Sequence, residues 1–231
     1  MTKKLRVEFF HDVICSACFP MSYRMRQLQQ QLPELEIVHR SFALVRKPED
    51  FDAMFGSREQ AKKEILTHWV NANQNDDLHR FNIKGLRESD FPFPTSMNAL
   101  YASKAAWFVG GGEESYWDVF DALQKAFFMD VQNIELDEVI EVAVQTTGID
   151  ITAWRRFYRS EEVKQAVEKD LELVRQHNLY SIPTLVVNGR HLINGALPLE
   201  TLKERLEKIE EQETVAVGES CEFQAGKFVC D

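Results

Sequence analysis

Two cysteines near the N-terminus offer the most evident chemistry in the chain. They stand in the segment Cys15-Ser16-Ala17-Cys18, directly after an apolar run and directly before a run of helix-forming residues. A cysteine at a helix N-terminus faces unpaired backbone N–H groups and the positive end of the helix dipole, which stabilise a thiolate, and the thiolate is the nucleophile. We therefore predict that Cys15 attacks a disulfide and that Cys18, one helical turn deeper, resolves the mixed disulfide.

Two other interpretations of this pair stay open, namely buried unreactive cysteines and half of a zinc site. A zinc site needs two further ligands, and the remaining cysteines, Cys221 and Cys230, stand at the other end of the chain. Zinc-binding pairs also sit on short turns more often than at the end of a buried strand. We expect no metal site, and thiol–disulfide exchange requires no cofactor.

A second signal is the segment Ser181-Ile182-Pro183-Thr184, which stands directly before the apolar run Leu185-Val186-Val187. Proline at the start of a strand removes a donor from the sheet ladder, and such a proline is a candidate for a cis peptide bond.

The elements that must position these residues follow from hydrophobic periodicity and turn signals. Residues 5–13 and 35–44 are predicted strands on either side of a helix over 17–31, and residues 184–193 form a predicted hairpin turning at Asn188-Gly189. Amphipathic runs over 58–73, 96–109, 114–129, 135–146 and 152–175 indicate a helical block, and helix returns from 199 to about 211. We expect an α/β domain over 1–46 and 176–211, a helical insertion domain over 47–175 and a C-terminal extension over 212–231.

Composition and charge limit the classes of partner. The 231 residues carry a formal net charge of -10, which disfavours non-specific attraction to nucleic acid or to an anionic membrane surface. Polar residues, Glu8 among them, interrupt the N-terminal region where a signal peptide would be apolar, and no run is long enough for a membrane span. We expect a cytoplasmic protein, in which a close cysteine pair is catalytic, redox-sensing or metal-binding before it is a structural bridge.

The two signals in this order resemble a known family. A strand ending in Cys-x-x-Cys, a helix, a helical insertion and then Ile-Pro-Thr-Leu-Val-Val-Asn-Gly are similar to the disulfide-oxidoreductase A (DsbA) superfamily, and more closely to its signal-less FrnE-like branch. The resemblance covers about residues 5–210 and is sharpest over 11–20 and 180–195. It implies a thioredoxin-like fold with a helical insertion domain. It also implies that Pro183 is cis and faces the Cys15 sulfur, while the backbone of Ile182 pairs with an extended substrate segment.

The same resemblance implies the partners, which are protein thiols and disulfides, with low-molecular-weight thiols as a further class. Many relatives carry Cys-Pro-aromatic-Cys or Cys-Pro-His-Cys, whereas this chain has Ser16-Ala17 between its cysteines. Because this dipeptide tunes the reduction potential, the direction of exchange stays open between oxidant, reductant and isomerase.

Other residues near the motif have a less definite meaning. His11 and Asp12 are interpreted first as strand-end polar groups exposed to water, and alternatively as groups that face the thiols, with Asp12 relaying a proton. The aromatic residues Phe19, Phe91, Phe93 and Trp107 would belong to the core or line a peptide groove.

A second cysteine pair lies in the tail. The segment from Cys221 to Cys230 is nearly mirror-symmetric about Ala225-Gly226, so a two-residue hairpin would pair Cys221 with Cys230 at a non-hydrogen-bonded position. The backbones approach closely enough there for a disulfide. We favour a redox relay or regulatory pair that exchanges with Cys15; the alternative is a stapled hairpin that never meets it.

Three functions remain in competition. The leading prediction is a protein thiol–disulfide oxidoreductase acting through Cys15 and Cys18. A second is a glutathione-dependent isomerase or kappa-type transferase of the same superfamily, although those proteins usually have a serine-centred site and this chain keeps both thiols. The third is a non-enzymatic protease adaptor that binds its partner through a thioredoxin-like scaffold.

Overall fold

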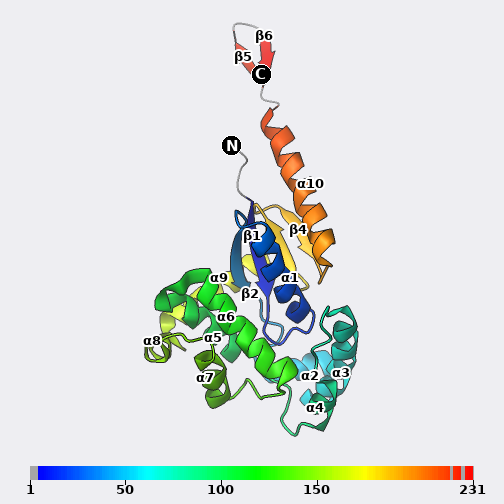
Figure 1. The fold of residues 1–231 in the computed structure, drawn as a ribbon, viewed down its shortest axis with the longest axis vertical. Helices are drawn as coiled ribbons and strands as arrows, with labels where there is room; N and C mark the ends of the chain where they lie inside the picture. The colour runs from blue at the N-terminus through cyan, green and yellow to red at the C-terminus, as the bar shows by residue number, and fades with distance from the viewer. Residues whose placement is uncertain (1–4, 219–220, 225–226, 231) are drawn as a thin grey trace.

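The computed structural model describes the backbone of residues 5–218, 221–224 and 227–230, and the side chains of residues 5–213. Its main sheet has the strand order β2-β1-β3-β4, built from β1 (Arg6–His11), β2 (Glu36–Ser41), β3 (Thr184–Val187) and β4 (His191–Asn194). β1 and β2 run parallel, whereas β3 is antiparallel to β1 and β4 is antiparallel to β3. Helices inserted between β2 and β3 complete the α/β fold class that the sequence predicts (Figure 1).

The helix α1 (Cys18–Gln31) connects the two parallel strands. Pro20 lies in its first turn, where backbone N–H groups have no intrahelical acceptor, so a proline costs little there. Met21, Met25 and Leu28 recur at helical spacing on the buried face and pack into the main core. This packing holds the cysteine motif at the junction of β1 and α1.

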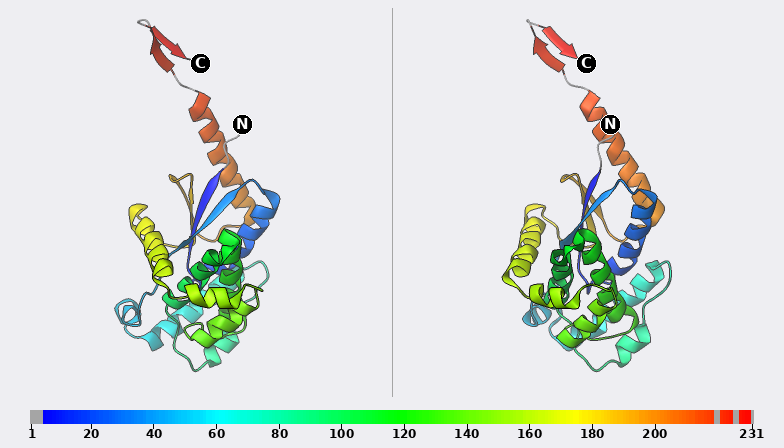
Figure 2. Two further views of the ribbon diagram at one scale, coloured as in Figure 1. Left: turned by 90° about the vertical axis from the view of Figure 1, so that its left-hand side faces the viewer. Right: turned by 60° about the vertical axis from the view of Figure 1, so that its left-hand side comes forward.

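Helices cover both faces of the sheet. Val7 and Phe9 of β1 belong to the main core cluster on the face covered by α1, whereas Phe10 packs with Val186 and Leu179 in a separate cluster. Leu173 and Val174 of α9 (Glu161–Gln176) pack against that second cluster. Figure 2 shows α1 and α9 on opposite sides of the sheet. The alternation of β1 side chains therefore produces a three-layer arrangement.

The insertion forms the lower part of the molecule in Figure 1. Besides α9 it contains α2 (Glu49–Phe55), α3 (Arg58–Asn75), α4 (Ile83–Glu88), α5 (Met97–Ala106), the π-helical turn η1 (Trp107–Gly111), α6 (Gly112–Gln124), the π-helical turn η2 (Lys125–Met129), α7 (Asp137–Gln145) and α8 (Ile151–Phe157). No helix in the described part of the chain is long and apolar enough to cross a membrane.

The single helix predicted over 152–175 is wrong. The chain leaves the helical conformation after Phe157, because Arg159 has a φ of 64°, and it restarts at Ser160. The Ser160 hydroxyl accepts a hydrogen bond from the Val163 backbone N–H at 3.3 Å and so caps α9. The short helices α2 and α4 were also not predicted, because neither is long enough to show a helical period.

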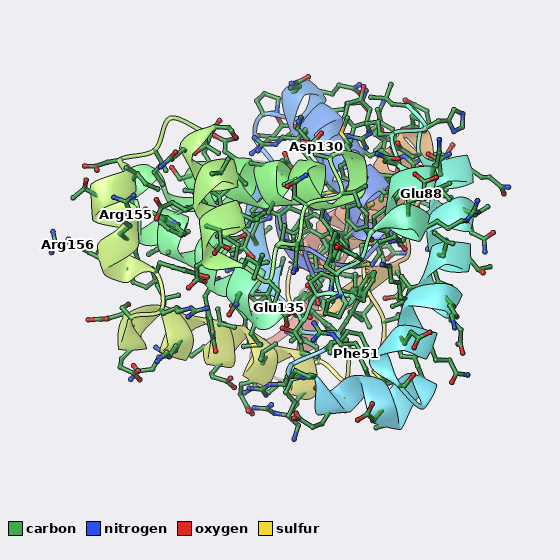
Figure 3. All side chains as sticks on the ribbon, turned by 90° about the horizontal axis from the view of Figure 1, so that it is seen from below. Phe51, Glu88, Asp130, Glu135, Arg155 and Arg156 are labelled. Carbon is green, nitrogen blue, oxygen red and sulfur yellow. The ribbon has the colours of Figure 1, made fainter. Side chains whose placement is uncertain are left out.

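A side-chain network closes the lower face of the insertion. Figure 3, which views the molecule from below, shows Phe51 and Glu135 near the middle of this face and Arg155 and Arg156 at its margin. The guanidinium of Arg58 binds the Glu135 carboxylate and donates to the Phe93 carbonyl at 2.7 Å. Helix α3 is thereby fixed to the segment before α5, which contains Phe93, and to the segment before α7, which contains Glu135.

Buried charges attach α9 and α5 to the sheet. Asp170 of α9 is 2 % exposed and accepts from Lys104 of α5 at 2.5 Å, from Arg40 of β2 at 3.1 Å and from the Ser41 N–H at 3.1 Å. Arg40 also donates to Glu8 of β1 at 2.5 and 2.8 Å. The charges compensate one another in a site that water does not reach freely.

Helix α10 (Leu199–Gly218) continues beyond the predicted end near 211. It begins after β4, at the end of the sheet where β1 also ends. At the opposite end, Glu213 contacts Arg190 of the β3–β4 turn and His191, the first residue of β4. The tail strands β5 (Cys221–Gln224) and β6 (Lys227–Cys230) follow α10 (Figure 1). They pair in the register that the sequence symmetry predicts, with Cys221 opposite Cys230.

Candidate active site

The cysteine motif lies in the turn that joins β1 to α1. Cys15 and Cys18 are free thiols; Cys15 is 6 % exposed and Cys18 is completely buried. The Cys15 carbonyl accepts from the Cys18 N–H at 3.0 Å, which closes the turn at the start of α1. The strand-to-helix junction that the sequence predicts is thus present, with the more accessible sulfur on the first cysteine.

The second signal segment meets the first. β3 is antiparallel to β1 with Thr184 opposite Phe10, so the residues before Thr184 lie beside the turn that follows β1. The Ile182–Pro183 peptide bond is cis, as the family resemblance implies. The Cys15 thiol donates to the Ile182 carbonyl over 3.8 Å between Sγ and O. The fold therefore brings together residues 167 positions apart in the sequence.

Burial distinguishes the two thiols chemically. Burial raises the pKa of the Cys18 thiol well above its usual value, and an interaction with the Cys15 thiol raises it further. The backbone of Asp12 acts in the opposite direction by hydrogen bonding to Cys18. Cys18 is therefore held as a thiol behind Cys15.

Asp12 is buried, so its interpretation as a water-exposed group is wrong. Its Oδ1 accepts from the Ile14 N–H at 3.2 Å, and its Oδ2 accepts from the Leu44 N–H at 2.8 Å and from the Ser96 hydroxyl at 2.5 Å. Burial raises the pKa of Asp12 to about 6, although these hydrogen bonds favour the carboxylate. Ser96 also accepts from the Val45 N–H at 3.0 Å, so Asp12 joins the motif turn to the insertion.

His11 is buried as well, because α6 covers the end of β1. Its Nε2 lies 2.9 Å from Nδ1 of His39 on β2, and its ring packs against Phe120 with centroids 4.0 Å apart. Burial lowers the pKa of both histidines well below the usual value; the charge of Lys104 adds to the effect on His11, and the charge of His11 adds to the effect on His39. These residues form part of the core beneath the motif.

A cavity of about 540 Å³ opens beside Cys15. Its walls come from the motif turn, the segment after β2, helices α2 and α3, and the loops around Ile182 and Ala196. The lining residues are Ile14, Cys15, Ser16, Ala17, Leu44, Val45, Met54, Phe55, Ile65, His68, Asn71, Ala72, Asn75, Phe93, Ile182 and Ala196. Sequence patterns did not indicate the contribution of α2 and α3. Of the four aromatic candidates only Phe93 lines this cavity; Phe19 stacks on Phe128 in the insertion core.

The tail cysteines are placed only by their backbone. The strand pairing sets Cys221 opposite Cys230, while their side chains, and therefore the predicted disulfide, lie outside the described residues. Helix α10 extends over 20 residues, about 30 Å, from the end of the sheet that carries Cys15 toward the other end. The described fold does not bring the two cysteine pairs together.

Among the described side chains, no cluster of three or more His, Cys, Asp or Glu residues could hold a metal ion.

Solved structures with a similar fold include disulfide-exchange proteins and an isomerase. A proposed protein disulfide isomerase from Nitrosomonas europaea superposes with a TM-score of 0.75 at 19% identity, covering 91% of this chain and 99% of that chain. The cytosolic disulfide reductase DsbM from Pseudomonas aeruginosa, also solved with GSH, has a TM-score of 0.68 at 15% identity, covering 88% and 99%. A 2-hydroxychromene-2-carboxylate isomerase has a TM-score of 0.63 at 14% identity, covering 91% and 98%. At these identities the similarity shows the fold alone.

No curated protein matches the sequence. The family model described as DSBA-like thioredoxin domain matches residues 6–207, which include the motif turn, the whole insertion and the cis-proline loop. This chain therefore belongs to the family of proteins with a DSBA-like thioredoxin domain.

Proposed function

We propose that this protein is a thiol–disulfide oxidoreductase in which Cys15 is the nucleophile and Cys18 the resolving thiol. The observation that carries the proposal is the asymmetry of the two sulfurs. Cys15 lines the cavity and contacts the Ile182 carbonyl, whereas Cys18 is wholly buried behind it. A substrate sulfur can approach Cys15 from the cavity, and Cys18 can reach Cys15 only from within the protein.

The chemistry follows in two balanced steps. The Cys15 thiolate attacks one sulfur of a substrate disulfide, which forms a Cys15–substrate bond and releases the other substrate sulfur as a thiolate. Cys18 then loses its proton and attacks the Cys15 sulfur, which forms the Cys15–Cys18 disulfide and releases the second substrate thiolate. The substrate gains two electrons and the protein loses two; the reverse sequence oxidises a substrate dithiol. No cofactor is part of either direction.

Burial of Cys18 supports this order of events. Because burial raises its pKa, Cys18 keeps its proton while Cys15 is a free thiol or thiolate. Once Cys15 is bound to substrate, its negative charge is gone and the coupling that disfavours a second thiolate disappears. Cys18 is then easier to ionise, so resolution follows mixed-disulfide formation.

Ile182 and Pro183 supply the substrate contact in this proposal. The Ile182 carbonyl already accepts the Cys15 thiol, and an extended substrate segment would pair with the Ile182 backbone in the same place. Pro183 lacks an N–H group, so it leaves the backbone beside Cys15 free of a donor directed into the sheet. Protein thiols and disulfides are the proposed partners, and low-molecular-weight thiols are a second class, because the DsbM neighbour was solved with GSH.

We further propose that the protein acts in the cytoplasm and belongs to the FrnE-like branch. A cytosolic disulfide reductase, DsbM, has a similar fold, which supports the cytoplasmic assignment. The direction of exchange follows the redox poise of that compartment, which favours reduction of substrates.

An isomerase or transferase of the same fold is the second candidate, because a 2-hydroxychromene-2-carboxylate isomerase superposes over nearly its full length. The retained pair of thiols favours disulfide exchange. A protease adaptor would use the scaffold without the thiols, and its partner binding would survive replacement of both cysteines by serine.

The tail pair has two proposed roles, as a redox relay with Cys15 or as a stapled hairpin. The course of α10 away from Cys15 supports the stapled hairpin within one chain. A relay would then require either a large rearrangement of the tail or the tail of a second copy.

Trapping of mixed disulfides tests the proposed function. A Cys18→Ser variant is incubated with cell extract and examined by non-reducing electrophoresis, with Cys15→Ser as the matched control. Adducts that form with Cys18→Ser and disappear on reduction, but do not form with Cys15→Ser, are expected. A correctly folded Cys18→Ser variant without such adducts would exclude the proposed exchange and favour the isomerase or the adaptor.

A further inference from the structure

A buried arginine on α1 binds two segments that border the cavity of the candidate active site. Arg24 is 2 % exposed, and every N–H group of its guanidinium donates a hydrogen bond. Nε and Nη2 donate to the two carboxylate oxygens of Asp77, each at 2.9 Å, and Nη2 also donates to the Asn75 carbonyl. Nη1 donates to the carbonyls of Ala196 at 3.1 Å and Leu197 at 3.2 Å. Arg24 therefore joins α1 to the end of α3 and to the segment after β4.

The contact with α3 satisfies the C-terminal end of that helix. Carbonyl groups in the last turn of a helix have no intrahelical donor, and they carry the negative end of the helix dipole. Helix α3 has no basic residue in its own last turn, so Arg24 supplies the positive charge from α1. The hydrogen bonds from Arg24 lower the pKa of Asp77, which keeps its negative charge beside the guanidinium. The end of α3, where Asn75 belongs to the cavity lining, is thus held against α1.

The contact with Ala196 extends the same link to the cis-proline loop. Ala196 and Asn75 both line the cavity, and Nδ2 of Asn75 donates to the Ala196 carbonyl at 3.0 Å. This carbonyl therefore accepts from both Asn75 and Arg24. The neighbouring Gly195 N–H donates to the Pro183 carbonyl at 2.8 Å. Arg24 thereby holds the α3 wall and the loop that contains the cis peptide bond in one arrangement.

An arginine at this position provides geometry more than stability. Burying a guanidinium is costly, and a buried ion pair often stabilises a fold no more than well-packed apolar residues would. The guanidinium is planar, however, and its donors point in fixed directions, so it sets the distances between the groups that it binds. Such distances matter where two reactants must align, because a misplacement of about 1 Å can slow a reaction about a hundredfold. The groups bound by Arg24 border the cavity from which a substrate approaches Cys15.

We propose that Arg24 is a positioning residue for thiol–disulfide exchange, because it holds the end of α3 and the segment around Ala196 at the spacing through which a polypeptide disulfide reaches Cys15. Arg24 acts on the approach of the substrate and leaves the reactivity of the Cys15 sulfur itself unchanged. This inference rests on the proposed exchange at Cys15, and it adds a residue that touches neither sulfur nor substrate.

The test compares two reactions of the fully reduced protein that depend on the cavity walls to different degrees. One is oxidation by the disulfide dimer of a blocked Gly-Ala-Cys-Ala-Gly peptide, in which Cys15 and Cys18 supply both electrons. The other is alkylation of Cys15 by iodoacetamide, which requires access to the sulfur alone. Samples are quenched in acid, and the state of both thiols is determined by mass spectrometry of the peptide that contains them. A second-order rate constant is obtained for each reaction.

Two arginines on the same helix provide the variant and its matched control. Arg24→Ala should lower the rate constant for the peptide disulfide about ten- to a hundredfold, as expected when positioning groups move by about 1 Å. The rate constant for alkylation, and its dependence on pH, should stay unchanged. Arg26 pairs with Asp118 at 2.7 Å and with Asp121 at 3.0 Å, and none of these residues lines the cavity. Arg26→Ala should therefore change neither rate constant.

Chemical rescue separates the lost guanidinium from a general loss of structure. Guanidinium chloride, at a concentration too low to unfold the protein, should restore part of the peptide reaction of Arg24→Ala, whereas sodium chloride at the same concentration should not. If Arg24→Ala does not fold, as judged by circular dichroism, Asp77→Asn replaces it, because the Asp77 side chain is 49 % exposed. Its peptide rate constant should fall several-fold while alkylation of Cys15 stays unchanged.

The outcomes distinguish this inference from the function beneath it. An unchanged peptide rate constant in folded Arg24→Ala, or in Asp77→Asn where that variant replaces it, would overturn the role of Arg24. So would an equal fall of both rate constants, or an equal loss in Arg26→Ala, and exchange at Cys15 would still stand. If the peptide disulfide does not oxidise the unsubstituted protein although iodoacetamide alkylates Cys15, the proposed function fails and this inference fails with it.

Discussion

The Nε2 atom of His11 and the Nδ1 atom of His39 lie 2.9 Å apart in a pair that is closed to solvent. The second ring nitrogens, Nδ1 of His11 and Nε2 of His39, have no hydrogen-bond partner within the described part of the chain. One N–H proton between the two neutral rings satisfies the contact, whereas a further proton on either ring would place an uncompensated charge in the core. The pair therefore makes stability depend on pH.

We expect the free energy of unfolding to fall as the pH decreases below about 6.5, the usual pKa of histidine. Because burial lowers the pKa of both rings in the folded state, the unfolded chain binds more protons in this range. The stabilisation is complete above pH 6.5 and is lost as the pH falls through the folded-state values. Asp12 acts oppositely: its contribution is complete below the usual carboxyl pKa and is lost as the pH rises through about 6.

Urea unfolding between pH 8 and pH 5.5 measures this dependence, and NMR titration of the ring carbons assigns it. Resonances of His11 and His39 that titrate at the usual histidine pKa would contradict the prediction.

Ser96→Ala should lower the free energy of unfolding by about 1–3 kcal/mol. The change removes the donor to the Asp12 carboxylate and the acceptor of the Val45 N–H, and both partners are buried. Ser103→Ala is the matched control, because Ser103 is also buried on α5 but only donates to Ala99 within its own helix. Chemical unfolding of both variants measures the effect. Equal losses in the free energy of unfolding would show that the hydrogen bond to Asp12 does not stabilise the protein.

Asp170→Asn should destabilise the protein by about 3–5 kcal/mol, because it leaves Lys104 without its buried counter-ion and weakens the contact with Arg40. The exposed ion pair between Glu141 and Arg155 provides the comparison. Glu141→Gln should cause a much smaller loss, since solvent screens that pair. Thermal unfolding at two salt concentrations measures both effects. A similar loss of stability in the two variants would contradict the prediction that the buried ion pair matters more than the exposed one.

Replacing Cys221 and Cys230 with serine should leave the rate of exchange at Cys15 unchanged at low protein concentration, because α10 carries the tail away from the motif. A concentration series of the double variant and of the unchanged protein, assayed by single-turnover oxidation, measures the effect. A loss of rate that does not depend on protein concentration would support a relay within one chain instead.

Local signals account for the parts of the site that the sequence predicts well. The Cys15–Cys18 spacing, the proline before an apolar strand and the Asn188-Gly189 turn each depend on a few adjacent residues, and the structure places all three as expected. The described hairpin includes Arg190 in its loop, since Val187 pairs with His191. Short-range chemistry of this kind can be recognised without the rest of the fold.

The rest of the site depends on the closure of the insertion. Asp12 and His11 are buried only because α5 and α6 cover the end of β1, and their own sequence neighbourhood contains no trace of this. The cavity beside Cys15 requires α2 and α3 to return to the motif turn, and α2 is too short to show a helical period. The break at Ser160 could have been found from its capping serine, although hydrophobic periodicity alone passed through it.

The course of α10 also determines how the protein would be oriented when tethered. β1 begins at the end of the sheet opposite to Cys15. Helix α10 approaches its C-terminus at this same end, as the contact of Glu213 with the β3–β4 turn shows. A fusion partner or surface linker attached before Arg6 or after α10 would therefore leave the thiol cavity pointing outward. The reactive end of the domain would face its substrates whichever end of the chain carried the attachment.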